Sequence, residues 1–147
     1  MSGPIIGIDP GVSGGIALID SGSIFLRPFK KGECPSEALN EVVGLCFEPP
    51  TTVIERVGGF IGKPQPGSAM FRFGQHAGFL QGWLSGRQIK TVFVTPQTWQ
   101  KGLTGLQPSG PERKRGLCAE AKRLFPHSKV TLATCDALLI ANWMKKQ

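Results

Sequence analysis

Residues 5–19, with the sequence IIGIDPGVSGGIALI, predict the β-hairpin around which the rest of the chain is organised. The first half is a short β-branched run, as a buried strand needs, and an apolar run at 16–19 resumes a strand. Pro10-Gly11 and Gly14-Gly15 are turn signals between the two strands. Asp9 is unusual because a carboxylate at the end of an apolar strand is costly to bury without a partner. Two interpretations are open: Asp9 caps the turn by accepting backbone N–H groups, or it belongs to a polar site.

The composition predicts one globular domain, residues 1–147, with a polyanionic partner. Hydrophobic residues make up 40% of the chain and charged residues 18%, which is an ordinary globular mixture. The net charge of +7 favours nucleic acid first and an anionic membrane second. No apolar run is long enough to span a bilayer, and the first residues do not resemble a signal peptide. None of the four cysteines lies in a C-x-x-C pair, so we expect reduced thiols and an intracellular protein.

The remaining pattern predicts an α/β fold with a five-stranded mixed sheet flanked by helices. Further strands are expected at 24–26, 51–55 and 91–94, and helices at 35–46, 69–85, 96–99, 112–124 and from 136 onward. The first three strands are joined by tight turns and form an antiparallel meander. The strand at 51–55 is entered from a helix, so it is expected to lie parallel to the first strand.

Two further acids are expected close to Asp9, at the edge of the sheet where the first strand ends. Glu55 ends the strand at 51–55, as Asp9 ends the first strand, and parallel strands bring their ends to one edge of the sheet. Asp136 opens the last helix, either as a simple N-cap or as a third site residue, because the apolar run at 138–141 must pack on the sheet. Three clustered carboxylates repel one another and need cations, for which Mg²⁺ or Mn²⁺ is suited. An acidic centre in a basic protein indicates a metal-dependent nuclease, in which two ions act on a phosphodiester.

Several other residues are candidates for contact with DNA or with a second subunit. In the Gly- and Pro-rich loop at 58–67, Phe60 either stacks on an exposed base, with Lys63 on a phosphate, or folds back onto the domain. The basic run at 112–115 either binds phosphates or is a solvated helix face. An additional apolar surface on the helix at 69–85 indicates a homodimer; it consists of Phe71, Phe79 and Trp83. His76 is predicted to be a structural or surface residue.

Four segments in a fixed order carry a family resemblance. They are IGIDPG at 6–11, VIERV at 53–57, VTPQTW at 94–99 and DALLIA at 136–141. Together they resemble the RuvC-type Holliday junction resolvases, particularly the shorter phage-like and organellar relatives, over nearly the whole chain. The resemblance implies an RNase H-like fold, a homodimer, and paired nicks in four-way DNA junctions during recombination and repair. The expected location is the interior of a bacterial or phage-infected cell, or an organelle.

The resemblance also implies roles for individual residues. Asp9, Glu55 and Asp136 are expected to bind Mg²⁺ or Mn²⁺, with Lys114 as a catalytic lysine. The candidate DNA contacts are Phe60, Lys63, Arg72, Lys101 (with Gln100 as the alternative alignment), Arg113 and Arg115. Relatives usually carry another Asp or His shortly before the last acid, but residues 131–134 here read TLAT. This departure leaves the second of two metal ions uncertain.

Three other functions fit parts of the sequence. The TLAT departure is compatible with a junction-binding protein that does not cleave. Another RNase H-like nuclease, acting on branched DNA or RNA–DNA hybrids, would carry the same acids. The Gly-rich turn after Asp9 also fits an actin-like ATPase, although that two-lobed fold needs a much longer chain than 147 residues.

Overall fold

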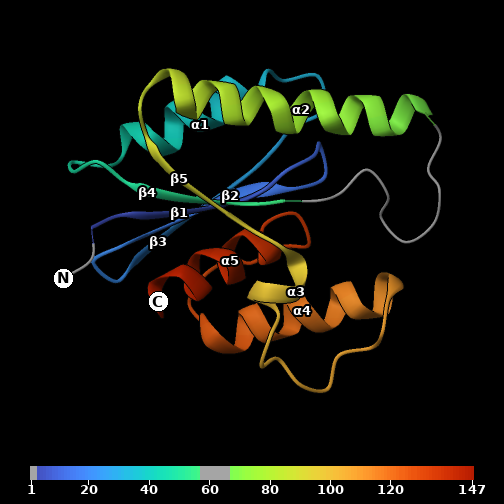
Figure 1. Cartoon of the computed structure of the whole chain (residues 1–147). Helices are drawn as coiled ribbons and strands as arrows, with labels where there is room; N and C mark the ends of the chain where they lie inside the picture. Colours follow the sequence, from blue (N-terminus) through green and yellow to red (C-terminus); the bar gives the residue numbers. More distant parts are fainter. Residues whose placement is uncertain (1–2, 57–66) are drawn as a thin grey trace.

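The computed structural model describes residues 3–56 and 67–147, which form a mixed five-stranded sheet between two layers of helices (Figure 1). The strands are β1 (Ile5–Asp9), β2 (Gly15–Asp20), β3 (Ser23–Pro28), β4 (Thr51–Glu55) and β5 (Lys90–Val94), in the order β3-β2-β1-β4-β5. The first three pair antiparallel, β4 lies parallel to β1, and β5 lies parallel to β4. The predicted α/β class, the meander and the two parallel strands are confirmed.

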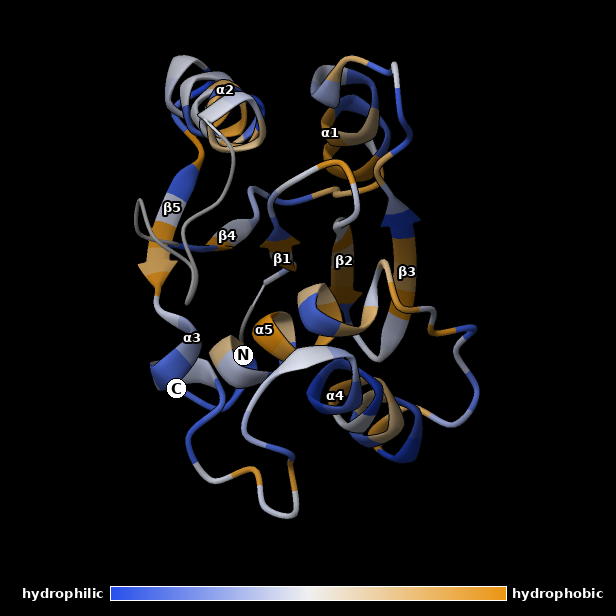
Figure 2. Ribbon diagram, turned by 90° about the vertical axis from the view of Figure 1, so that its right-hand side faces the viewer, coloured by the Kyte–Doolittle hydropathy of each residue, from blue (hydrophilic) through white to orange (hydrophobic). Residues whose placement is uncertain are grey.

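Helices cover both faces of this sheet. Helices α1 and α2 lie on one face, and α3, α4 and α5 lie on the other (Figures 1 and 2). Their bounds are α1 Pro35–Gly44, α2 Gly67–Gly86, α3 Pro96–Trp99, α4 Gly110–Leu124 and α5 Cys135–Lys145. Each lies where the sequence pattern predicts it, with starts displaced by up to two residues. None of the helices within the described part of the chain is long and apolar enough to cross a membrane.

Side chains of the two central strands alternate between the two cores. Ile6 and Ile8 of β1, with Ile54 of β4, are fully buried in the core beneath α1 and α2. Ile5 and Val53 belong to the opposite core, which α5 covers. Because side chains along a strand alternate with a period of two, the last residue of each strand also faces the α5 side. The strand-end acids of β1 and β4 therefore share one face.

A glycine in β1 allows α5 to lie directly against the sheet. A Cβ added to Gly7 would overlap the carbonyl oxygen of Ala137 and would lie 2.7 Å from the backbone nitrogen of Ala141. Any larger side chain would therefore push the helix away from the strand. Leu138 and Ile140 of α5 are fully buried, so the helix is held against the sheet by apolar burial. This close approach brings the first turn of α5 to the end of β1.

The loop that the sequence pattern assigns to DNA contact lies largely outside the described residues. Phe60 and Lys63 both fall within 57–66, so the roles expected of them remain predictions from the sequence.

Candidate active site

Asp9, the last residue of β1, lies close to two other charged side chains. Its partner in the neighbouring strand β2 is Gly15. On the other side, strand β4 ends beside it with Glu55. The side chain of Asp9 is 14% exposed, and its Oδ2 lies 3.8 Å from the Nζ atom of Lys114. Among the hydrogen bonds of the described residues, none joins a backbone N–H to the Asp9 carboxylate. The interpretation of Asp9 as a turn cap is therefore wrong, and Asp9 belongs to a charged cluster.

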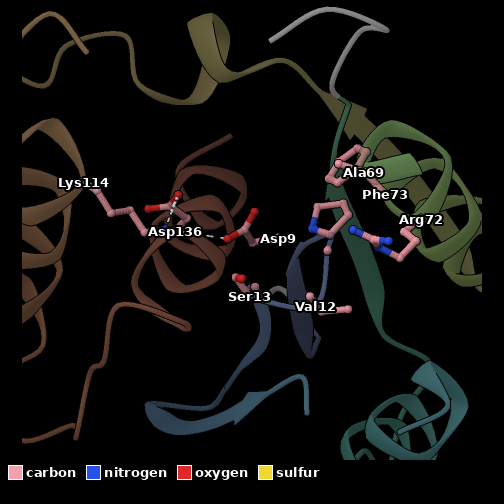
Figure 3. A pocket seen from close by; sticks show the side chains of 11 residues that line it. Asp9, Val12, Ser13, Ala69, Arg72, Phe73, Lys114 and Asp136 are labelled. Carbon is pink, nitrogen blue, oxygen red and sulfur yellow. Dashed lines mark ion pairs between the residues drawn. The ribbon is translucent and has the colours of Figure 1, made fainter. Parts of the chain in front are cut away.

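Asp136 meets the same lysine from the other side. Its Oδ2 lies 2.7 Å from the Lys114 Nζ, so the ammonium of α4 bridges the ends of β1 and α5 (Figure 3). The N-cap position of α5 is occupied by Thr134, whose side chain makes no capping hydrogen bond, and Asp136 lies in the first turn of the helix. The simple N-cap interpretation of Asp136 is therefore also wrong. A carboxylate at this place is stabilised by the helix dipole as well as by the lysine.

Glu55 completes the group, although a different side chain holds it. The indole Nε1 of Trp99 donates a hydrogen bond of 2.5 Å to Glu55 Oε2. Trp99 ends the short helix α3, and its ring is almost fully buried in the α5-side core. The sequence gives no sign of this contact between Trp99 and Glu55. The signal that was available is the position of α3 directly after β5, the strand paired with β4.

Burial and mutual repulsion dominate the electrostatics of this cluster. Burial, together with the neighbouring Asp136, raises the pKa of Asp9 to about 8, against the smaller opposing effect of Lys114. Burial also raises the pKa of Glu55, which the hydrogen bond from Trp99 partly offsets. Burial alone would lower the pKa of Lys114, but the two aspartates outweigh it and the pKa is raised. With all three acids ionised, the cluster would therefore carry more negative charge than the one ammonium of Lys114 compensates.

A cavity of about 450 Å³ opens beside this cluster. Its walls come from the turn after β1, from α2 and from the charged cluster; the side chains that Figure 3 labels are Asp9, Val12, Ser13, Ala69, Arg72, Phe73, Lys114 and Asp136. Arg72 is exposed and reaches the cavity from α2, opposite the acids. A polyanion entering this space would meet a cation on the far wall.

The other predicted basic residues lie on α4 and next to α3. Arg113 is held by two acceptors: its guanidinium donates to Gln100 Oε1 and, at 2.8 Å, to the carbonyl oxygen of Gln107. Arg113 and the exposed Lys101 line a second, polar cavity of about 510 Å³. Arg115 is exposed on α4. The two alternatives therefore differ in their surroundings: the Lys101 side chain is exposed, whereas the Gln100 side chain accepts hydrogen bonds from Arg113.

The donor chemistry of the cluster suits a hard divalent cation. The carboxylates of Asp9 and Asp136 already converge on one cation, the ammonium of Lys114, and burial together with Asp136 raises the pKa of Asp9. Within residues 3–56 and 67–147, however, no three His, Cys, Asp or Glu side chains are arranged as a metal-binding group. In this side-chain arrangement Lys114 supplies the positive charge, and binding of Mg²⁺ or Mn²⁺ by three acids remains a prediction.

The sheet order, the covering helices and the position of the cluster define an RNase H-like fold, and more narrowly the fold of the RuvC resolvases. The structure is similar to that of Thermus thermophilus RuvC in complex with a Holliday junction substrate, with a TM-score of 0.61 and 15% identity over 98% of this chain and 95% of that chain. A second Thermus thermophilus RuvC structure gives a TM-score of 0.60 and 15% identity, over 97% of this chain and 95% of that one.

A more distant similarity is to the Fowlpox virus resolvase in complex with Holliday junction DNA, with a TM-score of 0.46 and 12% identity over 97% of this chain and 99% of that chain. No protein-family model and no curated protein sequence matches this chain. At these identities the comparisons establish the fold alone. The resemblance to RuvC-type resolvases stated from four sequence segments is confirmed at that level.

Proposed function

We propose that this protein is a metal-dependent DNA endonuclease that resolves four-way junctions by paired phosphodiester hydrolysis. The observation that carries the proposal is the convergence of Asp9, Asp136 and Lys114, with Glu55 beside them, at one end of a RuvC-type sheet. Four charged groups from four different elements serve no purpose in packing, and burial together with the neighbouring Asp136 disfavours the ionised state of Asp9. Such an activity belongs to DNA recombination and repair, and it implies an intracellular protein.

Each residue of the cluster has a task in hydrolysis. Mg²⁺ or Mn²⁺, held by Asp9, Asp136 and Glu55, would supply stabilisation of the attacking water and of the leaving oxygen. The Lys114 ammonium is placed to neutralise charge that develops on a phosphoryl oxygen beside the two aspartates. Trp99 orients the Glu55 carboxylate through its indole N–H, as supporting residues commonly orient metal ligands.

The surrounding cations provide the contacts to the DNA backbone. Arg72 lies across the cavity from the acids, and Lys101 with Arg113 lines the second cavity. Arg115 adds a further exposed cation on α4. Phosphate contacts of this kind supply most of the affinity for DNA and make it salt-dependent. The net charge of +7 agrees with this assignment.

A second copy of the chain is proposed to pack on α2. Only Leu80 and Leu84 of this helix are buried, whereas Phe71 is 69% exposed and Phe79 is 41% exposed. Large aromatic side chains on an open helix face favour an interface between copies. Two copies related by a two-fold axis would present two active sites to one junction, which is what paired nicks require.

One observation favours a second candidate, a junction-binding protein with little or no cleavage. Thr131 and Thr134, which stand where relatives usually carry a further acid or histidine, lie with their hydroxyl groups 3.2 Å apart. The Thr134 hydroxyl also accepts a hydrogen bond of 3.1 Å from the Thr131 backbone N–H. These two side chains are hydrogen-bonded to each other, and residues 131–134 contain no carboxylate or imidazole group.

Incubation of the purified protein with an end-labelled four-way junction, with Mg²⁺ or Mn²⁺ supplied in separate reactions, decides between the two candidates. Nicks at symmetrical positions in opposite strands are expected for the wild type, and none for Asp9→Asn, which should still shift the junction on a gel. Asp20→Asn is the matched control, because Asp20 also ends a strand but lies at the other end of the sheet.

The alternatives give different patterns in the same assay. A shifted junction with no nicks under either metal would support the binding protein and contradict the nuclease. Competition by unlabelled RNA–DNA hybrid or flap DNA stronger than competition by junction would assign another nuclease substrate. Cleavage that persists in Asp9→Asn would contradict the assignment of the active site.

A further inference from the structure

His76 joins α2 to the turn that follows Asp9. The backbone N–H of Gly11 donates a hydrogen bond of 3.1 Å to His76 Nδ1, across 65 positions of sequence. Within residues 3–56 and 67–147, this is the only hydrogen bond between an α2 side chain and another element of the fold. The expectation that His76 is structural or at the surface does not include this contact.

The contact is part of a closed set of four residues. The Gly14 N–H donates to the Gly11 carbonyl at 3.0 Å, and the Phe29 N–H donates to the Gly14 carbonyl at 3.0 Å. The Phe29 ring then meets the His76 ring edge-on, with centroids 4.6 Å apart and planes at 81°. The turn is thus held at both ends. Gly11 has φ +107°, a backbone conformation that glycine adopts without strain.

Within the described part of the chain, the half of α2 that faces the active site contains no fully buried side chain. The buried residues of α2 are Leu80 and Leu84, both in its C-terminal half. Ala69, Arg72 and Phe73 line the cavity opposite Asp9 from the N-terminal half (Figure 3). They share one helix face with His76, because the spacings are three, four and seven residues. The hydrogen bond from Gly11 to His76 therefore links this helix face to the turn that follows Asp9.

The imidazole is suited to this role in its neutral form. Nδ1 can accept a hydrogen bond only when it carries no proton, which leaves the ring proton on Nε2. Burial lowers the pKa of His76, which keeps the ring neutral near pH 7. The acceptor is therefore present under the conditions in which a nuclease works.

We propose that His76 is a positioning residue, which fixes the Asp9 turn and the cavity-facing half of α2 relative to each other through the Gly11 N–H. Its contacts are with Gly11 and Phe29, and within the described residues it makes no hydrogen bond with the acids. Loss of the acceptor would let the end of β1 and the wall carrying Arg72 move independently, and misplacement by about 1 Å can lower a rate about 100-fold. The kinetic consequence rests on the proposed nuclease function, whereas the contact itself can be tested without it.

Two substitutions separate the hydrogen bond from the packing of the ring. His76→Asn keeps an acceptor, because the Asn Oδ1 takes the place of Nδ1, but it removes the ring that packs on Phe29. His76→Phe keeps an aromatic ring for Phe29 and removes the acceptor. Each variant is compared with wild type for single-turnover junction cleavage with Mg²⁺, for junction affinity, for melting temperature and for hydrogen exchange of the Gly11 amide.

We expect His76→Phe to lower the cleavage rate about 10- to 100-fold with nearly unchanged junction affinity, and to speed exchange of the Gly11 amide. His76→Asn is expected to stay within about threefold of wild type in rate, because a preserved acceptor preserves the geometry. Equal losses in both variants, or a greater loss in His76→Asn, would assign His76 to packing and overturn the proposal. If the wild type does not cleave, the proposed function fails, and the Gly11 exchange still decides: slow exchange in His76→Phe would overturn the positioning role.

Discussion

Removal of the Asp9 charge is expected to stabilise the folded protein while it abolishes cleavage. In the folded state burial and Asp136 raise the pKa of Asp9 from 3.8 to about 8. At about 1.4 kcal/mol for each tenfold change in proton affinity, ionised Asp9 carries a penalty on the order of 5 kcal/mol. Asp9→Asn keeps the shape of the side chain and cannot ionise, so this penalty disappears.

The pH dependence follows from the sign of the shift. Between pH 3.8 and about 8 the folded protein binds a proton that the unfolded chain has released, so wild-type stability falls as pH rises through this window. The stability gained by Asp9→Asn should therefore be within about 1 kcal/mol near pH 4 and grow to about 3–5 kcal/mol near pH 8.5. Mg²⁺ should stabilise the wild type near pH 8.5, because it binds only the folded carboxylates, and should leave Asp9→Asn nearly unaffected.

Urea unfolding followed by tryptophan fluorescence, at several pH values and with or without Mg²⁺, measures these differences. Asp20→Asn is again the control, and its free energy of unfolding should track the wild type. Two results would refute the inference that burial and Asp136 raise the pKa of Asp9 in the folded protein. One is an Asp9→Asn protein that is less stable than wild type near pH 8.5, and the other is a stability difference that does not change with pH. Equal stabilisation of wild type and Asp9→Asn by Mg²⁺ would refute metal binding at Asp9.

Three other substitutions test separate parts of the site. Lys114→Met should lower junction cleavage about 100-fold with nearly unchanged junction binding, measured by single-turnover kinetics and gel shift, because it removes the ammonium beside both aspartates. Gly7→Ala should destabilise the fold by about 3 kcal/mol in urea, since its methyl group overlaps α5, whereas Gly44→Ala, which meets nothing within 4 Å, should stay within about 1 kcal/mol of wild type. Trp99→Phe should keep the core and lose the donor to Glu55, lowering the cleavage rate about 10-fold at little cost in melting temperature; an unchanged rate would remove Trp99 from the site.

Much of the fold was predictable because local signals agree with one another. The β-branched runs, the Gly and Pro turns and the apolar helix spacings all correspond to observed elements, with ends displaced by a residue or two. The parallel pairing of β1 and β4 followed from the helix between them. The interpretations that failed, Asp9 and Asp136 as caps, concern acids whose local sequence looks the same whether they cap a turn or meet a lysine more than twenty residues away.

Local sequence patterns were enough to predict the strand and helix types, the ends of β1 and β4 at one edge of the sheet, and the acidic and basic residues of the candidate site. The packing of the folded chain was needed to show that Lys114 bridges Asp9 and Asp136, that Trp99 donates to Glu55 and that His76 accepts a hydrogen bond from Gly11. The physical reason is that elements are set by neighbours within a few residues, whereas these contacts depend on the packing of elements distant in sequence. Gly7 illustrates the division: its identity is plain in the sequence, but its purpose is visible only when α5 lies against it.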